Sequence, residues 1–163
     1  MLAKLNKHKQ ERSGQGFTII EVMIVLAIAG LIMLIVFLAV PALQRSARNT
    51  QRKTDVGRIA SAATTVLSNN NNTLSSLTTT ALQNEVGSSL SYYQQSQITV
   101  GAPSASPANT TSTNSVVVYP GAVCAPISTG GQGATTTNAE NTSIAITYST
   151  ETGGTPDLVC NNE

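Results

Sequence analysis

A long apolar stretch near the N-terminus dominates the pattern of hydrophobic and polar positions. Residues 17–43 are apolar apart from Thr18 and Glu21, and Val22–Val40 is an uncharged run of 19 residues. As a helix rising ~1.5 Å per residue, this run is about 28 Å long, close to the ~30 Å hydrocarbon core of a bilayer. The stretch therefore predicts a membrane-spanning helix.

Three other structures are compatible with such a stretch. A buried core helix is disfavoured, because the rest of the chain is too polar to surround a helix that is apolar on all faces. A secretory signal peptide fits the preceding basic residues and the small residues near Ala42, but signal peptides have a shorter apolar region that does not begin with an acid. A simple membrane anchor explains the length and leaves Glu21 without a role.

After residue 43 the apolar positions change to the spacing of an amphipathic helix. They recur every three or four residues and define one face that we expect to be buried: Val56, Ile59, Ala60, Ala63, Val66 and Leu67. Pro41 is the one strong breaker before Leu67, so the pattern predicts a single helix over roughly residues 17–68. The asparagines at 69–72 compete for backbone hydrogen bonds and are expected to end it.

The remaining residues predict a small head that is rich in Ser, Thr, Asn, Gly and Ala. A short helix is permitted between Leu74 and Leu90, weakened near its end at Gly87. Three strands are predicted, the last of them weaker: 116–119, 144–148 and 98–100. Two low-complexity segments are expected to be loops: 103–115 and 128–137, with a glycine turn at 130–133. The predicted fold class is α+β, with the long helix packed against a small antiparallel sheet.

Charge and histidine content exclude several functions. All nine Lys and Arg lie at or before Arg58, and five acids but no base follow it. DNA binding is therefore unsupported by charge on the later part of the chain. His8 is the single histidine, and no nucleotide, serine-hydrolase or metalloprotease motif is present. We expect no enzymatic activity, no cofactor and no metal site.

The junction before the apolar stretch carries the most specific motif. Residues 14–23 read GQGFTIIEVM and follow a short basic segment. This junction resembles the type IV prepilin signature, in which a basic leader ends in Gly before F-T-x-x-E and a long apolar helix. The resemblance is specific over residues 1–58 and loose beyond. It implies that an inner-membrane prepilin peptidase cuts between Gly16 and Phe17 on the cytoplasmic side and then N-methylates Phe17.

The resemblance also implies roles inside the apolar helix. Cleavage creates an α-amino cation at Phe17, about one helical turn from Glu21. In the family, this carboxylate is thought to meet the terminal amine of a neighbouring subunit; a position at the wetted membrane interface is the alternative. Related pilins are extended or locally melted in this part of the helix in the filament, which implicates Gly30 and Pro41. Many relatives place the proline earlier, where this chain has Leu38, and a simple kink at Pro41 stays open.

Five basic residues follow the apolar stretch on the expected helix: Arg45, Arg48, Arg52, Lys53 and Arg58. Solvated side chains are the default expectation. Asp55 lies three residues from both Arg52 and Arg58, so local ion pairs would suffice for it. Pairing with lipid headgroups or with acids of adjacent subunits stays open. With four basic residues before the stretch and five after it, charge alone does not fix the orientation in a membrane.

Cys124 and Cys160 are the only cysteines in the chain. Their even number, an exported context and a small core favour a disulfide between them. Pilins often close their C-terminal loop with such a disulfide. A free buried pair is the alternative, and the spacing matches no metal-site pattern.

The resemblance implies a non-catalytic pilus subunit in four segments: leader 1–16, membrane and filament-core helix 17–43, amphipathic helix 44–68, and extracellular head 69–163. We expect a single-pass inner-membrane protein with a cytoplasmic N-terminus that later enters an extracellular pilus. Its expected partners are copies of itself, the prepilin peptidase and methyltransferase, the pilus assembly machinery and membrane lipid. The family implies adhesion, twitching motility or DNA uptake. Alternatives are a minor pilin, a type II secretion pseudopilin, a membrane-anchored binding protein that does not polymerise, and a secreted protein cut near Ala42.

Overall fold

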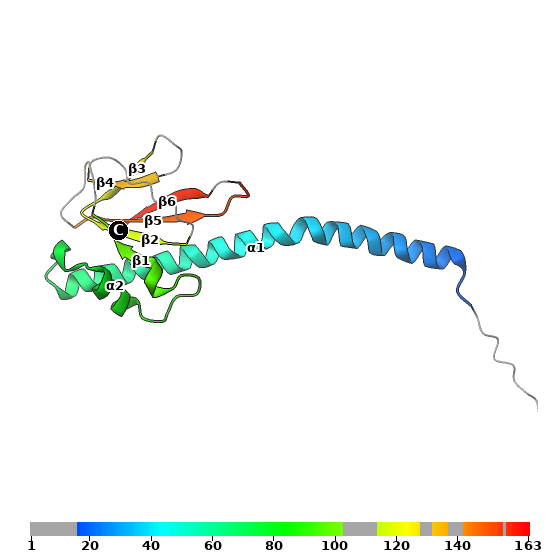
Figure 1. Ribbon diagram of the computed structural model, residues 1–163, viewed down its shortest axis with the longest axis horizontal. Coiled ribbons are helices and arrows are strands. Elements are labelled where there is room, and N and C mark those ends of the chain that lie inside the picture. The colour runs from blue at the N-terminus through cyan, green and yellow to red at the C-terminus, as the bar shows by residue number, and fades with distance from the viewer. Residues whose placement is uncertain (1–15, 103–113, 128–131, 137–141, 155) are drawn as a thin grey trace, which may run out of the picture. The chain divides into compact units, whose positions relative to one another are not determined.

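The computed structural model describes residues 16–102, 114–127, 132–136, 142–154 and 156–163. The chain divides into two units, Met1–Pro41 and Ala42–Glu163, and each is described by itself. One helix, α1 (Ile19–Asn69), contributes to both units (Figure 1). Its bounds lie within two residues of the predicted helix.

The first unit consists of the N-terminal part of α1 and the residues that precede it. All of its described residues, 16–41, are exposed. By length and composition, α1 is the one helix in the described part of the chain that could cross a membrane. The helix continues through Gly30 and Pro41. The expected break at these residues concerns the filament and stays a prediction.

The second half of α1 buries the predicted apolar face. All six residues of that face are buried, and Ile59 is fully enclosed. The helix ends at the asparagine tract, as expected. Asn71 and Asn72 have φ of +54° and +56°, a region that asparagine tolerates better than most residues. The Asn72 amide donates to the Leu67 carbonyl at 2.8 Å, which satisfies one of the last helical acceptors.

In the described part of the chain, three short helices follow α1. They are the 3₁₀ helix η1 (Leu74–Ser76), α2 (Thr79–Val86) and the 3₁₀ helix η2 (Gln95–Gln97). Thr78 caps α2 by accepting a hydrogen bond from the Ala81 amide at 3.2 Å. Gly87 ends α2 with a φ of +58°, which favours glycine. The predicted helix between Leu74 and Leu90 is thus divided and ends at its glycine.

Four strands form the main sheet, in the order β1-β2-β5-β6. Their bounds are Ile98–Val100 (β1), Val116–Pro120 (β2), Ile144–Thr150 (β5) and Asp157–Asn162 (β6). β2–β5 and β5–β6 are antiparallel. β1 runs parallel to β2, with Ile98 opposite Val116. The connection between these strands is long enough to permit a parallel pair, which a tight hairpin would not. The predicted α+β class is confirmed, with one parallel pair at the sheet edge.

A second, two-stranded sheet pairs β3 (Val123–Pro126) with β4 (Gln132–Thr135). The sequence predicted neither strand, nor β6. The expected loop at 128–137 is wrong where β4 lies, and Gln132 and Gly133 of the expected turn are strand residues; positions 128–131 and 137 lie outside the described residues. Gly133 and Ala134 are buried, so tertiary packing overrides their low strand propensity.

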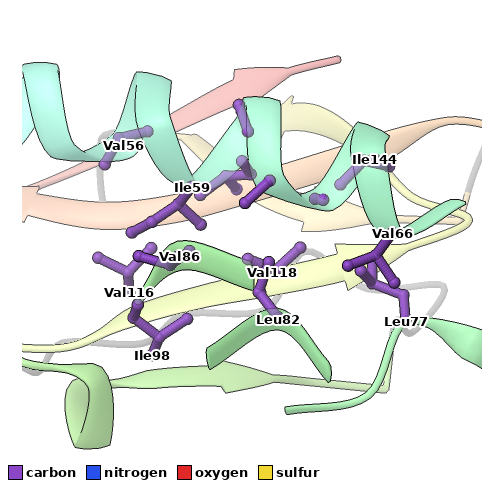
Figure 2. Close-up of a cluster of buried hydrophobic side chains, with 14 of the residues drawn as sticks. Val56, Ile59, Val66, Leu77, Leu82, Val86, Ile98, Val116, Val118 and Ile144 are labelled. Carbon is purple, nitrogen blue, oxygen red and sulfur yellow. The ribbon is translucent and has the colours of Figure 1, made fainter. Parts of the chain in front are cut away.

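Apolar side chains cover both faces of the main sheet. Figure 2 shows Ile59 and Val66 of α1 on one side of Val116 and Val118, with Leu82 of α2 close by. Side chains on the opposite face pack together with the β3–β4 pair: Val117, Tyr119, Ala122, Ala134, Ala145 and Cys160. A strand covered on both faces reads as a continuous apolar run, as Val116–Tyr119 does, rather than as an alternating one.

Candidate functional site

The junction motif lies at the start of α1. Gly16, Phe17 and Thr18 precede the helix, and all three are exposed. A Cβ atom built on Gly16 would meet no heavy atom within 4 Å. Nothing in the described part of the fold therefore requires glycine at this position. A requirement for glycine at position 16 would have to come from a protein that binds this segment.

Thr18 and Glu21 hold each other in a capping box. The Thr18 amide donates to Glu21 Oε2 at 2.8 Å, and Thr18 Oγ1 donates to the same oxygen at 2.7 Å. The Glu21 amide donates to Thr18 Oγ1 at 3.3 Å. These bonds satisfy two amides at the helix start that have no partner within the helix. The sequence analysis missed this arrangement, although T-x-x-E before an apolar run is its signature.

Glu21 is surrounded by an exposed apolar surface. A hollow beside its carboxylate is lined by Phe17, Val22, Val25 and Leu26. Glu21 is the only charged residue in 17–43. The site therefore offers one negative charge on a surface that would otherwise bind only apolar groups.

Cys124 and Cys160 form a disulfide with a Cα–Cα distance of 5.6 Å. Cys124 lies on β3 and Cys160 on β6, so the bond joins the two sheets covalently. The Cys124 amide also donates to Asn162 Oδ1 at 2.7 Å. The short β3–β4 pair is thus fixed to the edge strand of the main sheet.

Two charged residues on the second half of α1 do not face solvent. Arg52 is 1% exposed and Asp55 is fully buried. Arg48 Nη2 lies 2.6 Å from Glu151 Oε2, and Arg52 Nη2 lies 2.7 Å from Glu151 Oε1. The expectation of a solvated side chain is therefore wrong for Arg52. Of the local ion pairs expected for Asp55, the described residues form the one with Arg58, at 3.8 Å, and not the one with Arg52.

These residues, here called the charge cluster (Arg48, Arg52, Asp55 and Glu151), tie α1 to two loops. Asp55 accepts hydrogen bonds at 2.6–3.1 Å from the amides of residues 91–93, just before η2. Arg52 lies 4.5 Å from the centre of the Tyr92 ring and donates to its hydroxyl. The Asn49 side chain exchanges two hydrogen bonds with the backbone of Glu151. The end of β5 is thereby bound to α1.

The protonation states of the cluster follow from its contacts. Hydrogen bonds from Arg48 lower the pKa of Glu151, and burial opposes them. Glu151 is therefore ionised at neutral pH, and it forms ion pairs with the guanidinium groups of both Arg48 and Arg52. The sequence analysis missed Glu151, since nothing distinguishes it from the other acids of the head. The four-residue spacing of Arg48 and Arg52 was the available signal for a shared partner.

The described residues contain no group of three or more His, Cys, Asp or Glu side chains that could hold a metal ion. The candidate site features described above are an exposed junction, a carboxylate at the start of an apolar helix, a disulfide and the charge cluster.

Residues 12–37 match the family model described as the prokaryotic N-terminal methylation motif. This is the class III leader of type IV pilins and pseudopilins, so the resemblance at the junction is confirmed. No curated protein sequence and no solved structure matches the chain. The motif supports a type IV pilin or pseudopilin-like precursor, and it implies processing by prepilin peptidase. With the apolar helix, it fits a membrane-anchored pilin, a structural class of protein.

Proposed function

We propose that the chain is a type IV pilus subunit that is made as a membrane-inserted prepilin. Residues 1–16 are the cytoplasmic leader, 17–43 span the inner membrane, 44–68 are the amphipathic half of the helix and 69–163 are the external head. The observation that supports this most is the uninterrupted exposure of the apolar residues 17–41. Such a surface is stable only in lipid or against other apolar helices.

Processing converts the stored precursor into a subunit competent for assembly. Hydrolysis of the Gly16–Phe17 peptide bond leaves a carboxylate on Gly16 and an α-amino group on Phe17, which is then methylated. Residues 16–18 are exposed and lie outside the helix, which suits entry into a peptidase. The new amine is a cation that needs a partner when apolar helices exchange lipid for one another.

Glu21 supplies that partner in the proposed filament. In the isolated chain its carboxylate caps its own helix through Thr18. In the filament it would compensate the Phe17 amine of a neighbouring copy, which sets the axial register. The contact is heterologous and does not close, so it generates an open helical filament. Gly30 and Pro41 are the proposed positions where the helix loosens during packing.

The test is Glu21→Gln, which keeps the size of the side chain and removes its charge. Cleavage should proceed, and the mature protein should accumulate in the membrane fraction. Fibres in sheared supernatants should fall at least tenfold, because each added copy would bury an uncompensated amine. Glu85→Gln, an exposed change on α2, is the matched control and should leave the fibres unchanged. Normal fibres from Glu21→Gln would contradict the proposed role.

N-terminal sequencing of the mature protein separates the alternatives. N-methyl-Phe17 supports a pilin or pseudopilin, an intact Met1 supports a simple anchored protein, and a start near Ala42 supports secretion by ordinary signal peptidase. Mass spectrometry of sheared fibres then distinguishes the bulk subunit from a minor pilin. Adhesion, twitching motility and DNA uptake are functions that such fibres could serve.

A further inference from the structure

An apolar hollow lies on one face of α1 at the start of the helix, the blue end in Figure 1. It has a volume of about 430 Å³ and is lined by Phe17, Glu21, Val22, Val25 and Leu26. Val22 precedes Val25 by three residues and Leu26 by four, so these side chains share one helix face. Glu21 precedes Val25 by four residues and places a carboxylate at the N-terminal end of that face.

A more polar hollow adjoins the apolar one. It has a volume of about 490 Å³ and is lined by Gly16, Phe17, Thr18 and Glu21. The two hollows thus share Phe17 and Glu21, and the polar one lies toward the residues that precede the helix. Together they match a molecule that has a polar group at one end and an apolar chain at the other.

The Glu21 carboxylate has no charged partner in the described part of the chain. Its two hydrogen bonds from Thr18 come from neutral donors and both end on Oε2. None of the ion pairs among the described residues involves Glu21. The helix start supplies only about half a positive charge, so the net charge stays negative. In the uncleaved chain Phe17 is joined to Gly16 by a peptide bond, and its nitrogen is therefore not a cation.

The position of Glu21 in a bilayer follows from the proposed membrane insertion. If residues 17–43 span the membrane, Glu21 lies one residue before the uncharged run and hence near the border between headgroups and acyl chains. A carboxylate at this depth is costly without a partner. Both hollows belong to the first unit, so their relation to this border depends only on the N-terminal part of α1.

We infer that in the uncleaved chain the two hollows bind phosphatidylethanolamine. Its primary ammonium group lies in the polar hollow and donates a hydrogen bond to Glu21 Oε1, and one acyl chain enters the apolar hollow. The inference rests on the membrane insertion in the proposed function and does not require a fibre. Phosphatidylcholine has the same net charge and the same chains, but its quaternary ammonium group has no N–H to donate. A soluble amine has the donor but no chain for the apolar hollow.

The experiment measures lipid retention by native mass spectrometry of the full, uncleaved chain released from detergent micelles. Wild type should retain phosphatidylethanolamine roughly fivefold more than phosphatidylcholine, because a hydrogen bond between two charged groups adds to their attraction. Glu21→Gln should lower phosphatidylethanolamine retention to the level of phosphatidylcholine. Equal retention of the two lipids by the wild type would overturn the inference.

Two controls test whether the preference belongs to the hollows. Glu85→Gln removes one negative charge from an exposed position on α2 and should keep the preference of the wild type. Equal losses in Glu85→Gln and Glu21→Gln would overturn the inference. Millimolar glycerophosphoethanolamine, which has the headgroup without acyl chains, should not displace the lipid. Displacement would overturn the inference in favour of a soluble amine.

A second copy of the chain is the other occupant that the experiment can detect. A dimer of the full chain that excludes both lipids would assign the hollows to another helix and overturn the lipid site. Circular dichroism of each variant verifies that its helix content equals that of the wild type.

The outcome is distinguishable from failure of the proposed function. A chain that inserts into the membrane and prefers phosphatidylethanolamine but forms no fibres contradicts the pilus proposal alone. Normal fibres from a chain without the lipid preference would remove the lipid site and leave the pilus proposal intact. A chain found wholly in the soluble fraction contradicts membrane insertion, on which both proposals depend.

Discussion

The two parts of α1 belong to one continuous helix but differ in the composition and burial of their side chains. Residues 19–41 are exposed on every side, although they are almost wholly apolar, and Glu21 is their only charge. Residues 42–69 carry basic side chains and Asp55, yet they bury both apolar and charged groups against the head. Among the described residues, the apolar part buries none of its side chains, whereas the second part buries one face against the head.

The comparison shows that hydropathy alone does not assign burial along this helix. Uniform apolarity marks the exposed part, for which we propose partners outside the chain, namely lipid or other copies. Mixed composition with a three-to-four-residue period marks the part that packs internally. Charge follows the same division: Glu21 caps the helix locally, while Arg52 and Asp55 are satisfied by residues far away in sequence.

The largest expected effect comes from a substitution that should not disturb folding. Gly16→Leu should abolish cleavage and leave an uncut precursor in the membrane, because the peptidase subsite is expected to accept only small side chains. The structure has free space at this position, so the variant should fold normally. Gly30→Leu, a matched change at another glycine with free space, should be cleaved as wild type is. Mature Phe17 ends at normal levels from Gly16→Leu, measured by mass spectrometry, would contradict the prepilin assignment.

The second-largest effect is expected from removal of the disulfide in the head. Replacing both cysteines, Cys124→Ser with Cys160→Ser, opens a loop with a sequence separation of 36 residues. The chain-entropy estimate for such a loop is about 4 kcal/mol of stability. In a domain of this size we expect Tm to fall by about 10–20 °C, measured by circular dichroism of the full chain in detergent.

The matched control for the disulfide is the wild-type chain treated with a reductant, which should lose stability to a similar degree. Tm of the first unit's helix should not respond, because nothing in residues 17–41 depends on the bond. Equal Tm for wild type and double variant would mean that the β3–β4 pair is held by packing alone.

The long helix and the apolar core were predictable because their signals are periodic and local. The six residues of the amphipathic face and the strands at Val116 and Ile144 follow from spacing and composition. β4 was not predictable, because its Gly133 and Ala134 have low strand propensity and become strand residues only by packing on the main sheet. β6 has only three apolar residues in a row, Leu158–Cys160, between polar ones, and its pairing with β5 carries no local signal.

The candidate site divides in the same way. Gly16, Phe17 and Glu21 were predictable, because an ordered motif places them next to an apolar stretch. The partners of Arg48 and Arg52 were not, since Glu151 is about a hundred residues away and one of five acids that follow Arg58. The spacing of residues along a helix shows which side chains share a face. It does not show which residue, far away in sequence, contacts them.

A smaller effect is expected from the charge cluster. Glu151→Gln keeps the shape of the side chain and leaves Arg52 buried without its anion. Loss of one partner of a buried pair costs about 3–5 kcal/mol, and partial exposure of Glu151 reduces this to about 2 kcal/mol. Chemical denaturation of the full chain in detergent measures it. Glu85→Gln on the exposed side of α2 should cost under about 0.5 kcal/mol. Equal costs for the two variants would place Glu151 among ordinary surface charges.

The smallest effect separates the two roles of Glu21. Thr18→Ala removes the hydroxyl half of the capping box and should cost about 1 kcal/mol at the helix start. Hydrogen exchange at the first amides of α1 should accelerate about fivefold in a nanodisc, whereas Thr18→Ser, which keeps the hydroxyl, should exchange as wild type does. Because Glu21 keeps its charge in Thr18→Ala, fibres should form in near-normal amounts, unlike those expected of Glu21→Gln. If Thr18→Ala abolished fibres as completely as Glu21→Gln, assembly would depend on the cap rather than on the compensating charge.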